Sequence, residues 1–254
     1  MVNTRELQAI YVMWLRQMKR FLRSKGRLVS TIIQPLFFLF ILGSGFRSVV
    51  SLGEGGDYLY FLAPGIVAMS ILFSSMFTGV SVLWDKQFGF LQEVLVAPIS
   101  RFSIIIGRTL GGATTALIQG FIILIIAIGL GIPISSFFGF VLTISFMILI
   151  AFTAVGFGLI IASKMQDFQA FPLIMNLIIL PLLFLSSAFF PVASNETMKT
   201  IAFFNPLFYM VDGLRGSLIG SNNLLHPLLN LGIVFIICII MMAIGSYLFS
   251  KSEA

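Results

Sequence analysis

Long, uninterrupted runs of apolar residues recur along the whole of this chain. Six of them reach about 18 residues or more, the length at which an apolar helix crosses the hydrocarbon core of a bilayer. They cover residues 29–50, 58–83, 109–131, 137–163, 170–190 and 225–249. Barrel strands are shorter and alternate apolar with polar residues, so the pattern favours helices. The expected fold is all-α: a polytopic membrane protein with six transmembrane helices in a single domain over residues 1–254.

The segment before the first run has a different pattern. Across residues 5–25, apolar side chains such as Leu7 and Trp14 recur at helical spacing, and basic side chains such as Arg16 and Arg20 lie largely on other faces. An amphipathic helix of this kind lies in the membrane interface and is attracted by anionic lipid. The alternative is a plain juxtamembrane stretch. We expect the interfacial helix, followed by a first span that is retained because no cleavable signal peptide is evident.

The composition and the charges agree with a membrane location. Hydrophobic residues make up 59% of the chain and charged residues only 9%, against roughly 25% charged in soluble domains. With the N-terminus inside, twelve of the 15 Lys and Arg residues fall on the inner side of the six spans. This bias predicts a multi-pass protein of the cell (plasma) membrane whose N- and C-termini are both cytoplasmic. It also accounts for the net charge of +6 without a nucleic-acid partner.

The long inner segment at residues 86–101 mixes charge with apolar residues at helical spacing. Pro98 is expected to end a short helix there, and Ser100 to cap the next one. Such a helix is typical of a docking element for a soluble partner, although a loop that merely joins two spans is an equal alternative on the residues alone. The candidate docking residues are Phe90, Leu91, Glu93, Leu95, Pro98 and Arg101.

The long outer segment at residues 191–222 is apolar but interrupted by Pro and Asn. It is too broken to span, so it either dips into the membrane and returns or lies on the outer face. Asp212 and Arg215 are three residues apart and could pair across one helical turn. The candidate residues of this outer segment are Asn205, Pro206, Asp212 and Arg215.

These segments resemble a known family, the membrane subunits of ABC-2-type exporters. The stretch FLQEVLVAPISR at 90–101 is similar to the family pattern tLE-x-L-x-x-sP-i-s-R, with the acidic position shifted by one if Glu93 is its equivalent. The basic amphipathic helix before the first span is a second match. The third, and the most specific, is the C-terminal signature LP at 180–181, SAFFP at 187–191, NPL at 205–207 and DGLR at 212–215. The resemblance covers essentially the whole chain.

The resemblance implies an architecture and a function. The segment around Glu93 would be a coupling helix touching a separate ATPase subunit, residues 5–25 a connecting helix on the inner leaflet, and residues 191–222 short re-entrant helices. A homodimer, or a pair with a related permease, would export an amphipathic drug, lipid or lipid-linked glycan between its second and fifth spans. Asn176 and Phe184 are our candidates for that path, with a helix–helix hydrogen bond as the equal alternative for Asn176.

Several other functions are disfavoured by what the sequence lacks. It has no Gly-x-x-x-x-Gly-Lys-Ser/Thr phosphate loop, so ATP and Mg²⁺ are expected to bind a partner and the chain is not expected to be an enzyme. The single histidine, His226, does not make a metal site, which needs three or four ligands. An ion-coupled secondary transporter or channel is the alternative function, disfavoured because the spans hold almost no ionisable residues. An intramembrane enzyme is disfavoured by the lack of a catalytic set.

Overall fold

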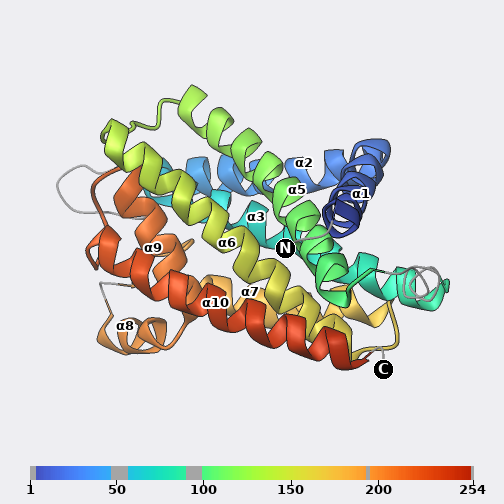
Figure 1. Ribbon diagram of the computed structural model, residues 1–254. Helices are drawn as coiled ribbons and strands as arrows, with labels where there is room; N and C mark the ends of the chain where they lie inside the picture. Colours follow the sequence, from blue (N-terminus) through green and yellow to red (C-terminus); the bar gives the residue numbers. More distant parts are fainter. Residues whose placement is uncertain (1–3, 47–56, 90–98, 193–194, 253–254) are drawn as a thin grey trace.

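The computed structural model describes residues 4–46, 57–89, 99–192 and 195–252, and within these ranges the chain forms helices and no strand (Figure 1). The amphipathic helix predicted over 5–25 is α1. The helices are α1 (Thr4–Arg23), α2 (Lys25–Gly45), α3 (Tyr58–Gln87), α5 (Arg101–Gly129), α6 (Phe137–Lys164), α7 (Ala170–Phe184), α8 (Glu196–Phe203), α9 (Pro206–Leu218) and α10 (Pro227–Ser252).

Five helices, namely α2, α3, α5, α6 and α10, are long and apolar enough to cross a membrane. This confirms the all-α, polytopic class. The run at 170–190, expected to be a sixth span, forms α7 with 15 residues. A helix of that length is about 22 Å long, shorter than the hydrocarbon core of about 30 Å. The chain leaves the helix after Phe184 and makes a buried turn in which Ser187 has a φ of 63°.

The core of the bundle is built around α3, which is mostly buried between α5 and α6 and also packs against α2 and α9 (Figure 1). α10 runs along α6, and small residues let these two helices approach closely. A Cβ placed on Gly245 would lie 2.7 Å from the carbonyl oxygen of Gly156. Close packing of small residues is a common way to hold membrane helices together, because no hydrophobic effect drives them together within lipid.

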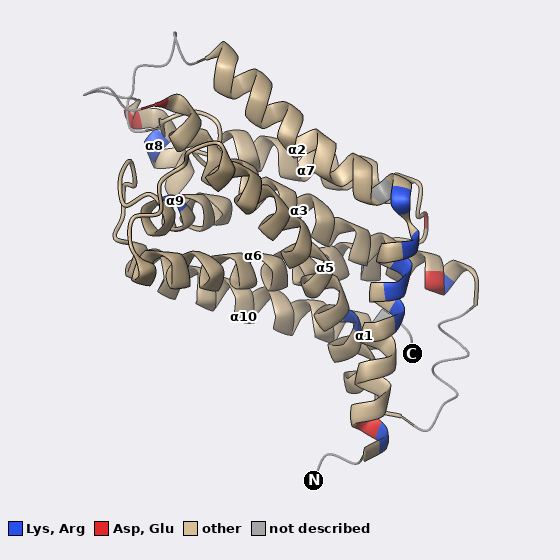
Figure 2. Cartoon of the chain, turned by 90° about the horizontal axis from the view of Figure 1, so that it is seen from above, with Lys and Arg blue, Asp and Glu red and all other residues tan. Residues whose placement is uncertain are grey.

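Positive charge gathers at one end of the bundle, along α1 (Figure 2). The start of α5 and the end of α10 lie there too, because Arg101 Nη1 donates to the Ser250 carbonyl at 3.0 Å. Glu6 of α1 accepts from the backbone N–H of Ser100, just before α5. We call this the basic end; it comprises α1, the last turn of α3, the start of α5 and the end of α10. α8 and α9 lie at the opposite, distal end (Figures 1 and 2).

Candidate functional site

A single buried acid joins three helices at the basic end. Asp85, in the last turn of α3, is only 4% exposed. Arg16 of α1 binds it in bidentate fashion, with Nη1–Oδ2 and Nη2–Oδ1 distances of 2.8 and 2.6 Å. Arg108 of α5 approaches Oδ2 to 3.0 Å, and Arg20 of α1 approaches Oδ1 to 3.6 Å. The carboxylate therefore fixes α1, α3 and α5 relative to one another.

The burial of Arg108 explains why an acid is needed here. Its side chain is 1% exposed, and a cation removed from water costs several kcal/mol unless an anion and hydrogen bonds compensate it. Asp85 supplies that anion, and the forked pairing with Arg16 adds directionality. One carboxylate faces three guanidinium groups, so the junction keeps a net positive charge.

Two glycines bring α1 against α5. A Cβ on Gly107 would lie 2.8 Å from the carbonyl oxygen of Ile10, and one on Gly111 would lie 2.7 Å from the Cβ of Gln17. The Gly107-x-x-x-Gly111 spacing thus serves the docking of the amphipathic helix. Trp14 Nε1 donates to Thr114 Oγ1 at 3.1 Å across the same contact, so α1 is attached along its length.

We expect Gly107→Ala to weaken this contact. The added methyl group would lie 2.7 Å from the Cβ of Met13 and would also meet α1 backbone, so α1 must move. The expected loss is about 1–3 kcal/mol of unfolding free energy, the usual cost of overpacking. Denaturant titration in detergent and protease access to α1 measure it. The matched control is Gly232→Ala in α10, where nothing lies within 4 Å of the new Cβ. Equal stability of the two variants would contradict the expectation.

The predicted docking segment lies mostly outside the described residues: Phe90, Leu91, Glu93, Leu95 and Pro98 belong to the undescribed range 90–98. Its flanks are described. Ser100 caps α5 as expected, with its Oγ accepting from the Ser103 N–H at 3.2 Å. Ser100 Oγ also donates to Glu6 Oε2 at 2.9 Å. Hydrogen bonds from Ser103 and Ser100 lower the pKa of the Glu6 carboxyl. The described flanks of the docking segment therefore lie beside Asp85 at the end of α3 and, through Ser100, against Glu6 of α1.

Arg101, also predicted to dock a partner, is the first residue of α5. Its side chain is exposed and donates to the Ser250 carbonyl at 3.0 Å, tying α5 to the end of α10. Nothing in this contact tests a role in docking, so that role stays a prediction.

At the distal end, Asn205 and Pro206 start α9. The Asn205 side chain accepts from the Leu207 N–H at 3.0 Å, and Pro206 takes the first helical position, where its missing N–H costs nothing. The Asn205 amide also donates to the Leu182 carbonyl at 2.6 Å, which links α9 to α7. The described residues of the outer segment thus form two short helices, α8 and α9, and no long one.

Arg215 of α9 is fully buried. Its Nε donates to the Phe61 carbonyl at 3.1 Å and its Nη2 to the Ser187 carbonyl at 2.6 Å, while its Nη1 donates to the Ser187 hydroxyl at 3.2 Å. Its guanidinium also lies 3.7 Å from the centre of the Phe61 ring. Through these hydrogen bonds, Arg215 connects the turn after α7 to the first part of α3.

Asp212 does not pair with Arg215, contrary to the expectation from their spacing. Its carboxylate accepts from the N–H groups of Leu224 and Leu225 at 2.8 and 3.0 Å and from the Asn230 amide at 2.9 Å. The two side chains leave α9 toward different partners: Asp212 holds the loop before α10, and Arg215 holds the turn after α7.

The two path candidates lie on the exposed face of α7. The opposite face, with Phe171 and Met175, is buried against the bundle, whereas Asn176 is exposed and Phe184 is 47% exposed. Asn176 is exposed in the single chain, so a second subunit could supply the partner for a helix–helix hydrogen bond. Both assignments to the path remain predictions.

Sequence reasoning missed the roles of Asp85 and Arg108, and it placed Ser187 only within the matched stretch SAFFP at 187–191. Charged residues at the end of an apolar run ordinarily flank a span in water, so the sequence gives no reason to expect these two to be buried. A usable signal was that Asp85 is the one acid within 58–87 and that α1 repeats arginine at 16 and 20. Nothing in the sequence marks Ser187 as a turn. Among the described residues, no group of His, Cys, Asp and Glu could hold a metal ion.

These features define a class: a helical, multi-pass membrane protein in which an amphipathic N-terminal helix is attached to the ends of the apolar helices. A sequence profile of ABC-2 type transporters matches residues 8–219. The chain belongs to the ABC-2 type transporter family and is a membrane subunit of an ABC transporter.

Three of the relatives that it matches are two transport permeases and a nodulation protein. The transport permease ycf38 of Cyanophora paradoxa is 29% identical over 258 residues, covering 96% of this chain and 89% of the relative. The inner membrane transport permease YadH of Escherichia coli (strain K12) is 26% identical over 218 residues, covering 85% and 84%. Nodulation protein J of Rhizobium leguminosarum bv. viciae is 26% identical over 230 residues, covering 88% and 86%.

Proposed function

We propose that this chain forms the membrane path of an ATP-driven exporter in which a separate ABC ATPase binds ATP and Mg²⁺. The basic end faces the cytoplasm, where the ATPase docks on the segment between α3 and α5. Family membership supports the partnership, and the sequence carries no phosphate loop of its own. The excess of Lys and Arg at the basic end supports the orientation.

The observation that carries the proposal is the Asp85 junction beside the predicted docking segment. That segment begins within a few residues of Asp85 on α3 and ends at Ser100, which is bonded to Glu6 of α1. Because Asp85 also binds Arg16 and Arg108, a force on the segment reaches α1, α3 and α5 together. ATP-driven movement of the motor would tilt these helices as a unit and change access from the inner to the outer side.

The path lies between two copies of the chain, or between this chain and a related permease. The predicted second and fifth spans are α3 and α7. Of these, α3 is mostly buried, whereas α7 is among the helices that leave an apolar face exposed in the single chain, with Leu173 at 71% and Leu177 at 75% exposure. The neighbouring α2 also exposes apolar side chains, with Phe37 at 61%. A path beside such faces offers few polar contacts, which favours an amphipathic drug, lipid or lipid-linked glycan. The two buried acids of the described residues, Asp85 and Asp212, are bound by protein groups, so an ion-coupled mechanism gains no support.

The test is co-purification of the tagged permease with an ABC ATPase co-expressed from the same source organism. Wild type is expected to retain the ATPase, and Glu93→Arg is expected to lose most of it, because the docking segment would present a cation where an acid stood. The matched control, Glu196→Arg, makes the same change on exposed α8 at the distal end and should retain the ATPase. No ATPase with wild type would refute the partnership; normal binding and transport by Glu93→Arg would refute the docking assignment alone.

A further inference from the structure

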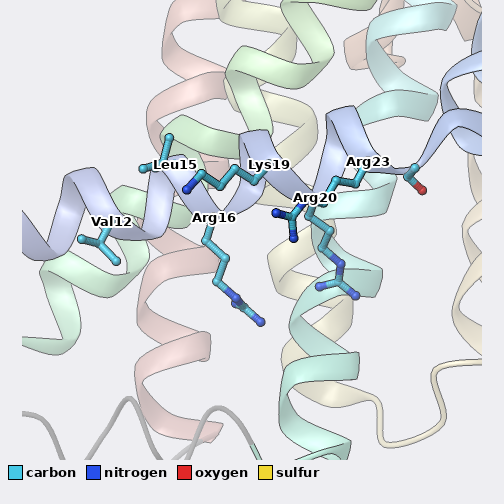
Figure 3. Close-up of a pocket in the computed structure, with 7 residues that line it drawn as sticks. Val12, Leu15, Arg16, Lys19, Arg20 and Arg23 are labelled. Carbon is cyan, nitrogen blue, oxygen red and sulfur yellow. The ribbon is translucent and has the colours of Figure 1, made fainter.

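An open hollow of about 580 Å³ lies on the side of α1, and Figure 3 shows its lining. Four cations line it: Arg16, Lys19, Arg20 and Arg23. The side chains of Arg16 and Arg20 extend from the same side of the helix in this view. Val12, Leu15 and Ser24 complete the lining, so the hollow combines a strongly basic lining with an apolar edge.

The positive charge of this hollow exceeds what the neighbouring acid can neutralise. Asp85 pairs with Arg16 and, at 3.6 Å, with Arg20, but it is shared with buried Arg108. Within the described parts of the chain, neither Lys19 nor Arg23 makes an ion pair, and both are exposed. The hollow thus has the charge and the free donors to receive an anion.

The position of the hollow favours a lipid as the source of that anion. Beside the basic residues, α1 carries a strip of apolar side chains that its own chain leaves uncovered: Leu7 is 56%, Tyr11 58% and Leu22 60% exposed. An amphipathic helix places such a strip in the acyl region and its cations at the level of the headgroups. Val12 and Leu15 make the apolar edge of the hollow, where an acidic protein surface would find little to contact.

We infer that this hollow binds the headgroup phosphate of an anionic phospholipid, a role distinct from export and from ATPase binding. Lys19 and Arg23 supply the principal contacts, and Arg20 adds a third donor. Guanidinium and ammonium groups form charge-assisted hydrogen bonds to phosphate oxygens, and the forked guanidinium matches their geometry. Lipid binding in this hollow requires neither transport nor an ATPase. The lipid site can therefore be absent while the proposed function is correct, and the proposed function can be wrong while the lipid site is present.

The two tryptophans of the chain report on this site. Trp14 lies on α1, and the ring of Trp84 lies 5.3 Å from the Arg20 guanidinium. We would reconstitute the protein alone in phosphatidylcholine vesicles that contain a small fraction of brominated phosphatidylglycerol or of brominated phosphatidylcholine. The anionic quencher is expected to quench tryptophan fluorescence more strongly at equal mole fraction. Equal quenching by the two lipids would overturn the inference.

The variant Lys19→Gln/Arg23→Gln should bind the anionic lipid at least about tenfold more weakly, since each surface cation contributes about 1 kcal/mol. The control Lys164→Gln/Lys251→Gln removes the same charge from the ends of α6 and α10, outside the hollow, and should keep the preference. Equal loss in both variants would show diffuse attraction and overturn the site. Relief of quenching by millimolar soluble glycerol phosphate would assign the hollow to free phosphates and overturn the lipid.

Discussion

Replacing Asp85 by leucine is expected to lower the free energy of unfolding by about 3–5 kcal/mol, the cost of leaving a buried charge without its partner. Arg108 is 1% exposed and would lose its anion, and Arg16 would lose a bidentate acceptor. The loss should concentrate at the basic end, because α1, α3 and α5 meet at this carboxylate. Denaturant titration in detergent measures the total, and protease access to α1 measures the local effect.

Two further variants test whether the loss comes from the unpaired charge of Arg108. In Asp85→Leu/Arg108→Met the buried cation is gone as well, and much of the lost stability should return, since apolar groups of similar volume can replace a buried ion pair at little cost. Asp167→Asn removes an exposed acid and should change stability by less than about 1 kcal/mol. If the double variant is less stable than Asp85→Leu alone, Asp85 does not compensate Arg108.

The parts of the fold that depend on local patterns could be predicted from the sequence. The amphipathic helix was expected over 5–25 and forms at Thr4–Arg23, because the alternation of apolar and basic residues at helical spacing is itself the signal. The runs predicted at 58–83 and 137–163 form α3 and α6 with the same starting residues. Long apolar stretches leave no other way to satisfy the backbone in lipid.

The length of the fifth helix could not be predicted in the same way. Hydropathy is continuous through 170–190, yet the helix ends at Phe184. What interrupts it is tertiary: the backbone of Ala188 passes so close to Gly65 of α3 that a Cβ there would clash, and Tyr58 donates to the Phe189 carbonyl at 2.7 Å. Donors supplied by α3 and α9 replace the helical hydrogen bonds. A hydropathy pattern contains no information about those donors.

The same limit applies to the charged residues. The sequence marks Asp212 and Arg215 as important, and their spacing suggests a pair. Each instead binds groups far along the chain, Asp212 the loop before α10 and Arg215 the turn after α7. The sequence shows where the charged residues lie along the chain. Which groups they bind depends on which helices the fold places next to one another. The Asp85 junction is the clearest case, since residues 16, 85 and 108 share no local motif.

Replacing Arg215 by methionine is expected to lower the free energy of unfolding by on the order of 3 kcal/mol, the upper range for leaving a buried hydrogen-bonding group unsatisfied. Methionine keeps much of the volume but none of the donors. The Ser187 carbonyl and hydroxyl would both lose the guanidinium, and the left-handed backbone at Ser187, with its φ of 63°, would lose the contact that holds it. Denaturant titration in detergent measures the loss.

The local consequence distinguishes this role from general destabilisation. The turn that follows α7 should loosen before the rest of the bundle, so hydrogen exchange should increase first over residues 185–190 and at the start of α3. Lys199→Met makes the same cation-to-methionine change on α8 at the distal end and should leave both stability and exchange unaltered. Uniform exchange across the bundle in Arg215→Met would mean that Arg215 does not act through the Ser187 turn. Preferential exchange there would make Arg215 the residue that lets α7 stop short of a full span.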